Sequence, residues 1–179
     1  RNATKTAVET AKNAGALVSF DPNIREPLWD DMEDAKRQTA YGISQCDILK
    51  ISDNEIKWFT SIPDYEKAVK YLYDKYNVPL ILVSLGADGS MAFHDNQCVY
   101  VPACHMDNTI ETTGAGDTFM GCILNYVLDH SLVLSGGQIY EMLQIANAAA
   151  AFITTRKGAL RVMPEMEDIR RVVEATKNR

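Results

Sequence analysis

The sequence predicts an α/β fold of three layers, in which a mostly parallel sheet lies between helices and carries one antiparallel hairpin. In the first half of the chain, apolar segments of strand length alternate with segments of helical periodicity. This alternation is typical of a parallel sheet covered on both faces. Two strand patterns with a short polar link between them then indicate a hairpin. The sequence has no internal repeat or interdomain linker, so we expect residues 1–179 to form a single domain.

The first elements follow from periodicity. Residues 3–15 place alanines at helical spacing and end at Gly15, which predicts a helix. Residues 16–20, ALVSF, predict a short buried strand. Residues 30–44 then predict a second helix, and residues 47–51, DILKI, predict a second strand.

The middle of the chain contains the predicted hairpin. Residues 63–77 have the spacing of an amphipathic helix and lead into the β-rich segment 79–85, PLILVSL. Residues 89–95 and 98–104 indicate two strands joined by the polar link DNQ, at one margin of the sheet. Three helices are predicted to complete the fold, one after GAGD, one over residues 137–156 and one over residues 163–177.

Composition excludes several functional classes. Hydrophobic residues make up 46% of the chain, enough for a core. The chain has 18 Lys and Arg residues and 24 Asp and Glu residues, and no segment concentrates basic residues among aromatic ones. A nucleic-acid partner is therefore not expected. The most apolar stretch, residues 122–134, is interrupted by Asn125, Asp129 and His130, which argues against a membrane span. Four cysteines without CxxC spacing indicate reduced thiols and a cytoplasmic protein.

Polar segments follow each predicted strand, where ligands of open α/β sheets bind. They are DPNIRE, SDNE, GADGS and ETTGAGDTF. Each one alone is a common turn or helix-capping sequence. Their joint occurrence at the carboxyl ends of successive strands favours a ligand site.

The segment ETTGAGDTF, residues 111–119, has the chemistry of an anion site. Gly114 and Gly116 allow backbone conformations in which successive N–H groups converge at the start of a helix. Those N–H groups have no intrahelical acceptors, so they can bind a phosphate. Asp117 would repel that anion unless it accepts a proton from a nearby substrate hydroxyl. A tight turn before a helix is the alternative interpretation.

The quoted segments together resemble a known family. TTGAGDTF, FDPNIREPLW, LKISDNE, VSLGADGS and ANAAAAFITTRKGA match, in order, segments of PfkB-type carbohydrate kinases of the ribokinase-like superfamily, and the chain most resembles the carboxyl-terminal part of fructokinases. Two positions depart from the family pattern. Glu111 stands where the family usually has Asp, which keeps the charge, and Ser52 stands where its NxxE motif has Asn.

The resemblance implies roles in phosphoryl transfer. Asp117 resembles the catalytic base, and the backbone of Gly114, Ala115 and Gly116 resembles the anion hole for the γ-phosphate. Glu55, with Ser52, matches the motif that organises Mg²⁺ and phosphates through water. A helix N-cap at Ser52 or Asp53 is an equally good interpretation of the serine.

The resemblance also implies binding sites for ATP, the sugar and a cation. The ATP-binding positions implied by the resemblance are Ser84, Gly86, Gly89 and Asn147. The implied positions for substrate or phosphate are Asp21, Asn23 and Arg25. A monovalent cation such as K⁺ is implied near Glu111 and Gly158. The alternatives are a turn for the glycines, a tightly packed helix around Asn147 and a solvated loop for Arg25. His94, His105 and His130 have no metal-ligand spacing.

Family members carry an amino-terminal half with most sugar contacts and a small β lid, and the matching segments cover only the part after it. We therefore expect a partial domain that is inactive alone, with an unpaired sheet edge that invites a homodimer. The resemblance implies an ATP-dependent sugar kinase with fructose as the first candidate acceptor. Ribose or 2-keto-3-deoxygluconate specificity stays open, as does a noncatalytic nucleotide-binding or interaction module. A nicotinamide-dependent oxidoreductase is not favoured because no GxGxxG follows the first strand.

Overall fold

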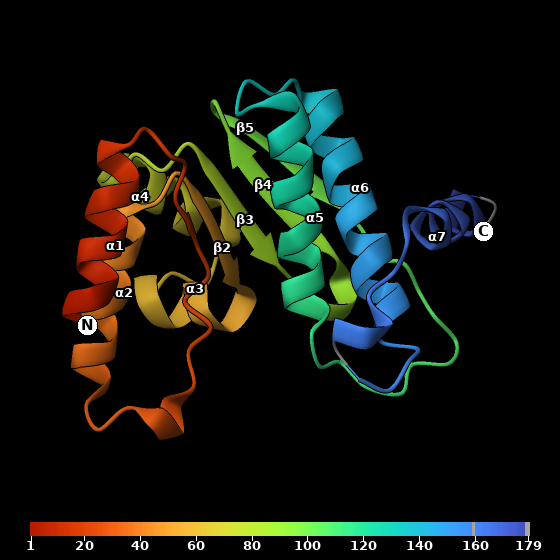
Figure 1. Ribbon diagram of the computed structural model, residues 1–179, viewed down its shortest axis with the longest axis horizontal. Coiled ribbons are helices and arrows are strands. Elements are labelled where there is room, and N and C mark those ends of the chain that lie inside the picture. The colour runs from red at the N-terminus through yellow and green to blue at the C-terminus, as the bar shows by residue number, and fades with distance from the viewer. Residues whose placement is uncertain (159, 178–179) are drawn as a thin grey trace. The chain divides into compact units, whose positions relative to one another are not determined.

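The computed structural model describes residues 1–158 and 160–177 (Figure 1). The chain divides into two compact units, which we describe separately. Unit 1 comprises Arg1–Val83 and Phe93–Asn96, and unit 2 comprises Ser84–Ala92 and Gln97–Arg179. The strands are β1 (Ser19–Phe20), β2 (Ile48–Ser52), β3 (Leu80–Ser84), β4 (Ser90–His94) and β5 (Gln97–Val101).

The five strands form one mixed sheet in the order β1-β2-β3-β4-β5. β1 and β2 are parallel, with Ser19 opposite Ile48. β4 and β5 are joined by two residues, Asp95 and Asn96, which have φ values of 47° and 60°. Positive φ at both positions is what a tight two-residue hairpin requires. The predicted hairpin is therefore confirmed, with a link one residue shorter than DNQ because Gln97 begins β5.

In unit 1, the helices are α1 (Asn2–Asn13), α2 (Met32–Gln45), α3 (Asp53–Thr60) and α4 (Tyr65–Tyr76), and a 3-10 turn, η1, covers Glu26–Leu28. The core is formed by β2 and β3 with the inner faces of α2, α3 and α4. Fully buried large side chains of this core include Ile43, Leu49, Ile51, Ile56, Leu72 and Ile81. Helix α1 has no buried residue.

One prediction for unit 1 needs correction, and one helix was not predicted by periodicity. The segment 16–20 was expected to be a buried strand, but β1 has only two residues and Leu17 is 54% exposed. The reason is position, because β1 is the end strand of the sheet and pairs only with β2. Periodicity did not predict the helix α3 over residues 53–60, which the sequence indicated only through a possible N-cap at Ser52 or Asp53. Its eight residues are too short for a clear periodic pattern.

In unit 2, the helices are α5 (Ala115–His130), α6 (Gly136–Ile153) and α7 (Met166–Lys177), with 3-10 turns η2 (Gly86–Asp88) and η3 (Leu160–Val162). The three predicted helices are confirmed. α5 and α6 lie side by side (Figure 1), and α7 packs on α6. The Tyr126 hydroxyl of α5 donates to Glu141 of α6 at 2.9 Å, and burial together with this carboxylate raises the pKa of Tyr126 to about 12. Among the described residues, no helix is long and apolar enough to cross a membrane.

The side-chain amide of Asn147 ties α6 to the hairpin within unit 2. Its Oδ1 accepts a hydrogen bond of 2.8 Å from the Ser90 hydroxyl, and its Nδ2 donates to the carbonyls of Val101 and Pro102, each at 3.1 Å. Asn147 is 7% exposed and Ser90 is fully buried. Because buried polar groups are costly without partners, these bonds fix where the chain leaves β5.

Gly89 permits a close approach of two backbone segments at the same place. Its φ is 113°, and a Cβ atom at this position would lie 2.2 Å from the Val101 carbonyl oxygen and 2.7 Å from the Ala103 nitrogen. Neither the conformation nor the space allows a side chain. Packing therefore explains this glycine, in addition to the turn that the sequence indicated.

We expect Gly89→Ala to lower the free energy of unfolding by about 2 kcal/mol or more, because the added Cβ collides with backbone atoms at a positive φ. Gly121→Ala is the matched control, since it lies inside α5 and its Cβ would meet nothing within 4 Å. That control should be stabilising by up to about 1 kcal/mol. Urea unfolding followed by circular dichroism measures both. If Gly89→Ala were as stable as the unmodified protein, the close backbone contact at Gly89 would not exclude a side chain.

We also expect Asn147→Ala to cost about 2 kcal/mol or more, since it leaves the buried Ser90 hydroxyl and the Val101 carbonyl without a partner. Asn125→Ala is the control, because Asn125 is an exposed residue of α5. Its effect should stay within about 0.5 kcal/mol. A small effect at Asn147 in the same unfolding measurement would contradict a clamping role.

Candidate functional site

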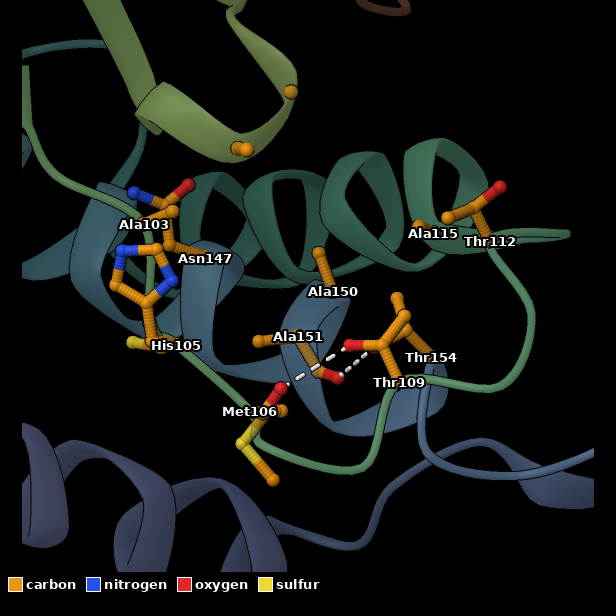
Figure 2. Close-up of a pocket in the computed structure, with 13 residues that line it drawn as sticks. Ala103, His105, Met106, Thr109, Thr112, Ala115, Asn147, Ala150, Ala151 and Thr154 are labelled. Atoms are coloured by element: carbon orange, nitrogen blue, oxygen red, sulfur yellow. Dashed lines mark hydrogen bonds between the residues drawn. The ribbon is translucent and has the colours of Figure 1, made fainter.

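A cavity of about 330 Å³ lies within unit 2 (Figure 2). Its walls come from η2, the loop after β5, the start of α5 and the carboxyl-terminal half of α6. The small side chains of Ala150 and Ala151 on α6 leave the space open. The residues that line it are Gly86, Ala87, Ala103, Cys104, His105, Met106, Thr109, Thr112, Ala115, Asn147, Ala150, Ala151 and Thr154. Such a mostly apolar hollow with a few polar groups is the usual form of a small-molecule site.

The loop that forms one wall is fastened to the end of α6. The backbone N–H groups of Ile110 and Glu111 both donate to the Thr154 carbonyl, at 2.8 and 3.1 Å. The Thr109 hydroxyl lies 3.3 Å from the Met106 carbonyl, to which it donates, and 3.4 Å from the Thr154 hydroxyl. These contacts hold the loop over the alanine face of α6 and define the depth of the cavity.

The structure brings together some of the predicted nucleotide residues. Gly86 and Asn147 both line the cavity, but Ser84 and Gly89 do not. The Asn147 amide already makes three hydrogen bonds to the protein. Asn147 therefore fixes the position of the cavity wall, and its amide is already occupied by protein groups.

At the start of α5, Gly114 has a left-handed conformation, whereas Gly116 lies inside the helix and has no positive φ. Gly114 is the N-cap, with φ 81° and no capping side chain. The first α-helical bond runs from the Thr118 N–H to the Gly114 carbonyl, and the Ala115 N–H donates to the Thr112 carbonyl at 3.2 Å. By helix geometry, the N–H groups of Gly116 and Asp117 then have no intrahelical acceptor. Together with the helix dipole they favour an anion at this end.

Asp117 lies in the first turn of α5 and is exposed. It borders a groove next to Thr118 and Met163 and does not line the 330 Å³ cavity. The Thr118 hydroxyl donates to the Gly114 carbonyl at 2.8 Å, which keeps the turn at Gly114 in place. An exposed carboxylate at this position is open to a hydroxyl from solvent or from a substrate.

The predicted cation region is only partly organised by side chains. Glu111 is attached through its backbone to Thr154, and Gly158 is half-buried with φ 126°. Over residues 1–158 and 160–177, no group of three or more His, Cys, Asp or Glu side chains is arranged to hold a metal ion.

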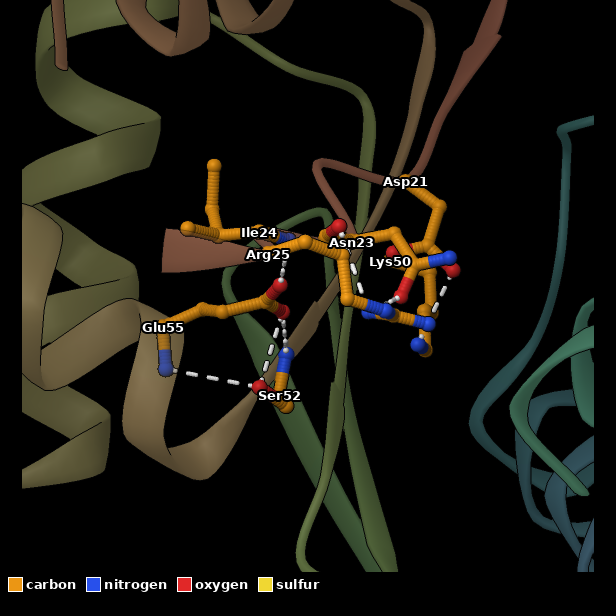
Figure 3. A network of polar contacts seen from close by, with 7 residues as sticks. All are labelled: Asp21, Asn23, Ile24, Arg25, Lys50, Ser52 and Glu55. Carbon is orange, nitrogen blue, oxygen red and sulfur yellow. Dashed lines mark hydrogen bonds and ion pairs between the residues drawn. The ribbon is translucent and has the colours of Figure 1, made fainter. Parts of the chain in front are cut away.

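A second polar cluster lies within unit 1 (Figure 3). Glu55 Oε1 accepts from the Ile24 N–H at 2.7 Å, and Oε2 accepts from the N–H and hydroxyl of Ser52 at 2.9 and 2.8 Å. The Ser52 hydroxyl in turn accepts from the Glu55 N–H, so the two residues form a capping box at α3. The N-cap interpretation of Ser52 is confirmed. Glu55 thereby fastens the DPNIRE loop to the end of β2.

Asp21 of this cluster is paired with Lys50, a residue that the sequence analysis did not select. The Lys50 ammonium donates to Asp21 Oδ2 at 2.9 Å. Burial raises the pKa of the Asp21 carboxyl above its ordinary value, and the Lys50 charge opposes that rise. The available signal was a lysine in the middle of the otherwise apolar strand DILKI.

Asn23 and Arg25 lie together on the exposed side of the cluster. Asn23 has φ 45°, a conformation that asparagine tolerates better than most residues. The Arg25 guanidinium donates to the Asn23 carbonyl at 3.3 Å and also to its side-chain oxygen. Arg25 and Lys50 both border a cavity of about 290 Å³, together with Asn23, Asn54 and Glu55.

Comparison with known proteins supports the resemblance inferred from the motifs. The model of the pfkB family of carbohydrate kinases matches residues 1–166. Fructokinase-2 of Solanum lycopersicum is 37% identical over 167 residues, which are 92% of this chain and 50% of that protein. The chain spans about half the length of most of the curated relatives that it matches, and 78% of one relative from Arabidopsis thaliana.

Solved structures give the same assignment. A fructokinase double mutant from Vibrio cholerae O395 in its fructose, ADP and potassium ion bound form has a TM-score of 0.85 and 28% identity, covering 97% of this chain and 55% of that one. Aminoimidazole riboside kinase from Salmonella enterica, complexed with aminoimidazole riboside and an ATP analog, has a TM-score of 0.80 and 27% identity, covering 94% of this chain and 56% of that one.

These matches confirm the predicted ribokinase-like α/β fold and its partial extent, since the aligned part is about half of each solved kinase. The family model covers nearly the whole chain. The chain therefore belongs to the pfkB family of carbohydrate kinases.

Proposed function

We propose that this chain carries the nucleotide-binding part and the catalytic base of an ATP-dependent sugar kinase, with fructose as the first candidate acceptor. The observation that carries the proposal is the start of α5, where the first N–H groups have no intrahelical acceptor and Ala115 lines the 330 Å³ cavity. The fructokinase relatives and the solved fructokinase with fructose and ADP support the same activity and acceptor.

ATP is proposed to bind with its adenosine part in the 330 Å³ cavity and its phosphates toward α5. Thr112 and Ala115 line the cavity at the start of that helix, and the N–H groups of Gly116 and Asp117 belong to the same first turn. These donors, together with the turn at Gly114, would stabilise the charge on the γ-phosphate. Ser84, Gly86, Gly89 and Asn147 would then act by shaping the surrounding backbone.

Asp117 is proposed to accept the proton of the sugar hydroxyl. As the hydroxyl oxygen forms its bond to the γ-phosphorus, the proton passes to the Asp117 carboxylate and the bond between that phosphorus and the departing ADP oxygen breaks. The exposure of Asp117 at the first turn of α5 suits this role.

Mg²⁺ would bind with the ATP phosphates, where it neutralises charge. Glu55 fits an indirect role, because its two oxygens already accept three hydrogen bonds from Ile24 and Ser52. A carboxylate so engaged can still accept from a metal-bound water, and Mg²⁺ usually keeps several waters. Asp21, Asn23 and Arg25 are proposed to bind substrate or a phosphate within unit 1, and K⁺ is proposed to bind backbone carbonyls near Glu111 and Gly158.

A noncatalytic nucleotide-binding module is the second candidate. It would require only the nucleotide cavity of unit 2, without a proton-accepting role for Asp117. The two candidates differ in one measurement, sugar-dependent formation of ADP, which only the kinase gives.

We expect Asp117→Asn to lower turnover by about 10²- to 10⁴-fold, because the amide cannot accept the proton. Affinity for ATP should change little, since the backbone donors remain. Asp129→Asn is the control, as Asp129 is an exposed carboxylate near the other end of α5. A coupled assay of sugar-dependent ADP formation measures turnover. Unchanged turnover in Asp117→Asn would remove this residue from the base role.

We expect Ala150→Leu to weaken binding of a nonhydrolysable ATP analogue by about tenfold or more, because the larger side chain fills the cavity. Ala7→Leu on the exposed surface of α1 adds the same volume away from the cavity and should leave affinity unchanged. Calorimetric titration of the two variants makes the comparison. Equal affinities would place the nucleotide elsewhere.

A further inference from the structure

A cavity of about 740 Å³ lies within unit 2, between the loop after β5 and helix α7, and we call it the α7 cavity. Ala103, His105 and Met106 of that loop line it, and the same three residues line the 330 Å³ cavity proposed for the nucleotide. Ala150 lines the nucleotide cavity and not the α7 cavity, whereas the reverse is true of Arg171. The loop is therefore a wall that two separate cavities share.

One wall of the α7 cavity is apolar. Val172 is buried in a core cluster of unit 2, with 8% of its surface exposed. Met106 and Phe152 pack against the same cluster and also line the cavity. Ala175 lies three positions after Val172, on the same face of α7, and borders the cavity as well. An apolar part of a ligand can pack against this wall, and its removal from water is favourable.

Arg156, just after the end of α6, presents hydrogen-bond donors at the edge of this wall. Its guanidinium group lies 4.2 Å from the centroid of the Phe152 ring, and both residues line the α7 cavity. This cation–π contact holds the group against the ring. Within residues 1–158 and 160–177, the Arg156 side chain has no hydrogen bond or ion pair. Its N–H donors, which lie in the plane of the group, are therefore open to a ligand.

A second guanidinium group comes from α7. Arg171 lines the cavity and pairs with Glu167 at 3.3 Å, while Glu167 itself does not line it. The two side chains are 70% and 65% exposed. Because exposed ion pairs of this kind contribute only about 0–1 kcal/mol, an anion in the cavity can compete with Glu167 for Arg171.

Two carboxylates also line the α7 cavity and oppose the charge of the arginines. Asp168 Oδ2 accepts a hydrogen bond of 3.2 Å from the Glu165 N–H, and Asp107 is exposed, so solvent screens its charge. The cavity therefore has no large excess of positive charge. An anion alone gains little there, whereas an anion joined to an apolar body gains from the guanidinium donors and from the apolar wall together.

We propose that the α7 cavity is a second ligand site, which takes a small organic anion with an apolar body. Arg156 and Arg171 bind the oxyanion group, and the body packs on the wall formed by Val172 and its neighbours. The oxyanion is a carboxylate or a phosphate, which present the same acceptor oxygens to a guanidinium group. The proposal does not depend on the kinase function.

The test titrates four probes into the full chain and follows the backbone amide signals by two-dimensional NMR. Phenyl phosphate and benzoate carry both an oxyanion and an apolar ring, phenol carries only the ring, and inorganic phosphate carries only the oxyanion. The variant Arg156→Met keeps an unbranched side chain beside Phe152 but removes the donors. Arg170→Met is the matched control, because Arg170 is an exposed arginine of α7 that does not line the cavity.

At least one of phenyl phosphate and benzoate should shift the amide signals of α7 and of residues 103–108 in a saturable way, and more tightly than phenol or inorganic phosphate. Arg156→Met should weaken this binding about fivefold or more, as expected for a charge-assisted hydrogen bond at a partly exposed site, with little change in the thermal midpoint. Arg170→Met should have no effect. Which of the two probes binds more tightly distinguishes a phosphate ligand from a carboxylate ligand.

Two further variants separate the α7 cavity from its neighbour. Ala175→Leu fills part of the α7 cavity and should weaken the same probe, whereas Ala150→Leu fills the nucleotide cavity and should leave it bound. The proposal would be overturned if neither anionic probe bound, if phenol bound as tightly as both of them, or if Arg156→Met and Arg170→Met gave the same affinity. Loss of the probe in Ala150→Leu but not in Ala175→Leu would also overturn it, since the probe would then occupy the nucleotide cavity.

Discussion

The amide of Asn147 is the contact on which the candidate nucleotide site depends. It holds the carbonyls of Val101 and Pro102, where the chain leaves β5, and Gly89 lets the neighbouring backbone approach that place. The loop that follows is fastened again at Thr154, on the same helix. The cavity is therefore the space between two points of attachment on α6. Its size is set by the alanines that lie between these points.

In unit 1, a polar side chain also holds a loop in place, and this side chain is the carboxylate of Glu55. Glu55 satisfies the N–H of Ile24 and completes the capping box of α3 with Ser52. In both units, these polar side chains hold loops in place. The groups that do not hold loops in this way are the exposed Arg25 guanidinium in unit 1 and the first N–H groups of α5 in unit 2.

Periodicity was enough to predict α4, α5, α6, α7 and the β4–β5 hairpin, because each has a long apolar stripe or strong turn chemistry. It failed for the eight residues of α3 and for β1, whose exposure follows from its place at the end of the sheet. The roles of Asn147 and Lys50 needed the structure. Asn147 bonds to Ser90, 57 residues away, and Lys50 to Asp21, 29 residues away. The spacing of residues along the chain does not reveal contacts over such sequence distances. Asn147 could therefore be selected only by resemblance, and Lys50 was not selected.

The comparisons bear more strongly on the phosphoryl donor than on the acceptor. The solved fructokinase holds fructose and the riboside kinase holds aminoimidazole riboside, yet the chain matches them with 28% and 27% identity over nearly its full length. Their ligands have one component in common, an adenine nucleotide, ADP in one and an ATP analog in the other. A match shared by kinases of different acceptors is evidence for the chemistry that they share. This is why the proposed function rests on the cavity and the start of α5, whereas fructose rests on the relatives alone.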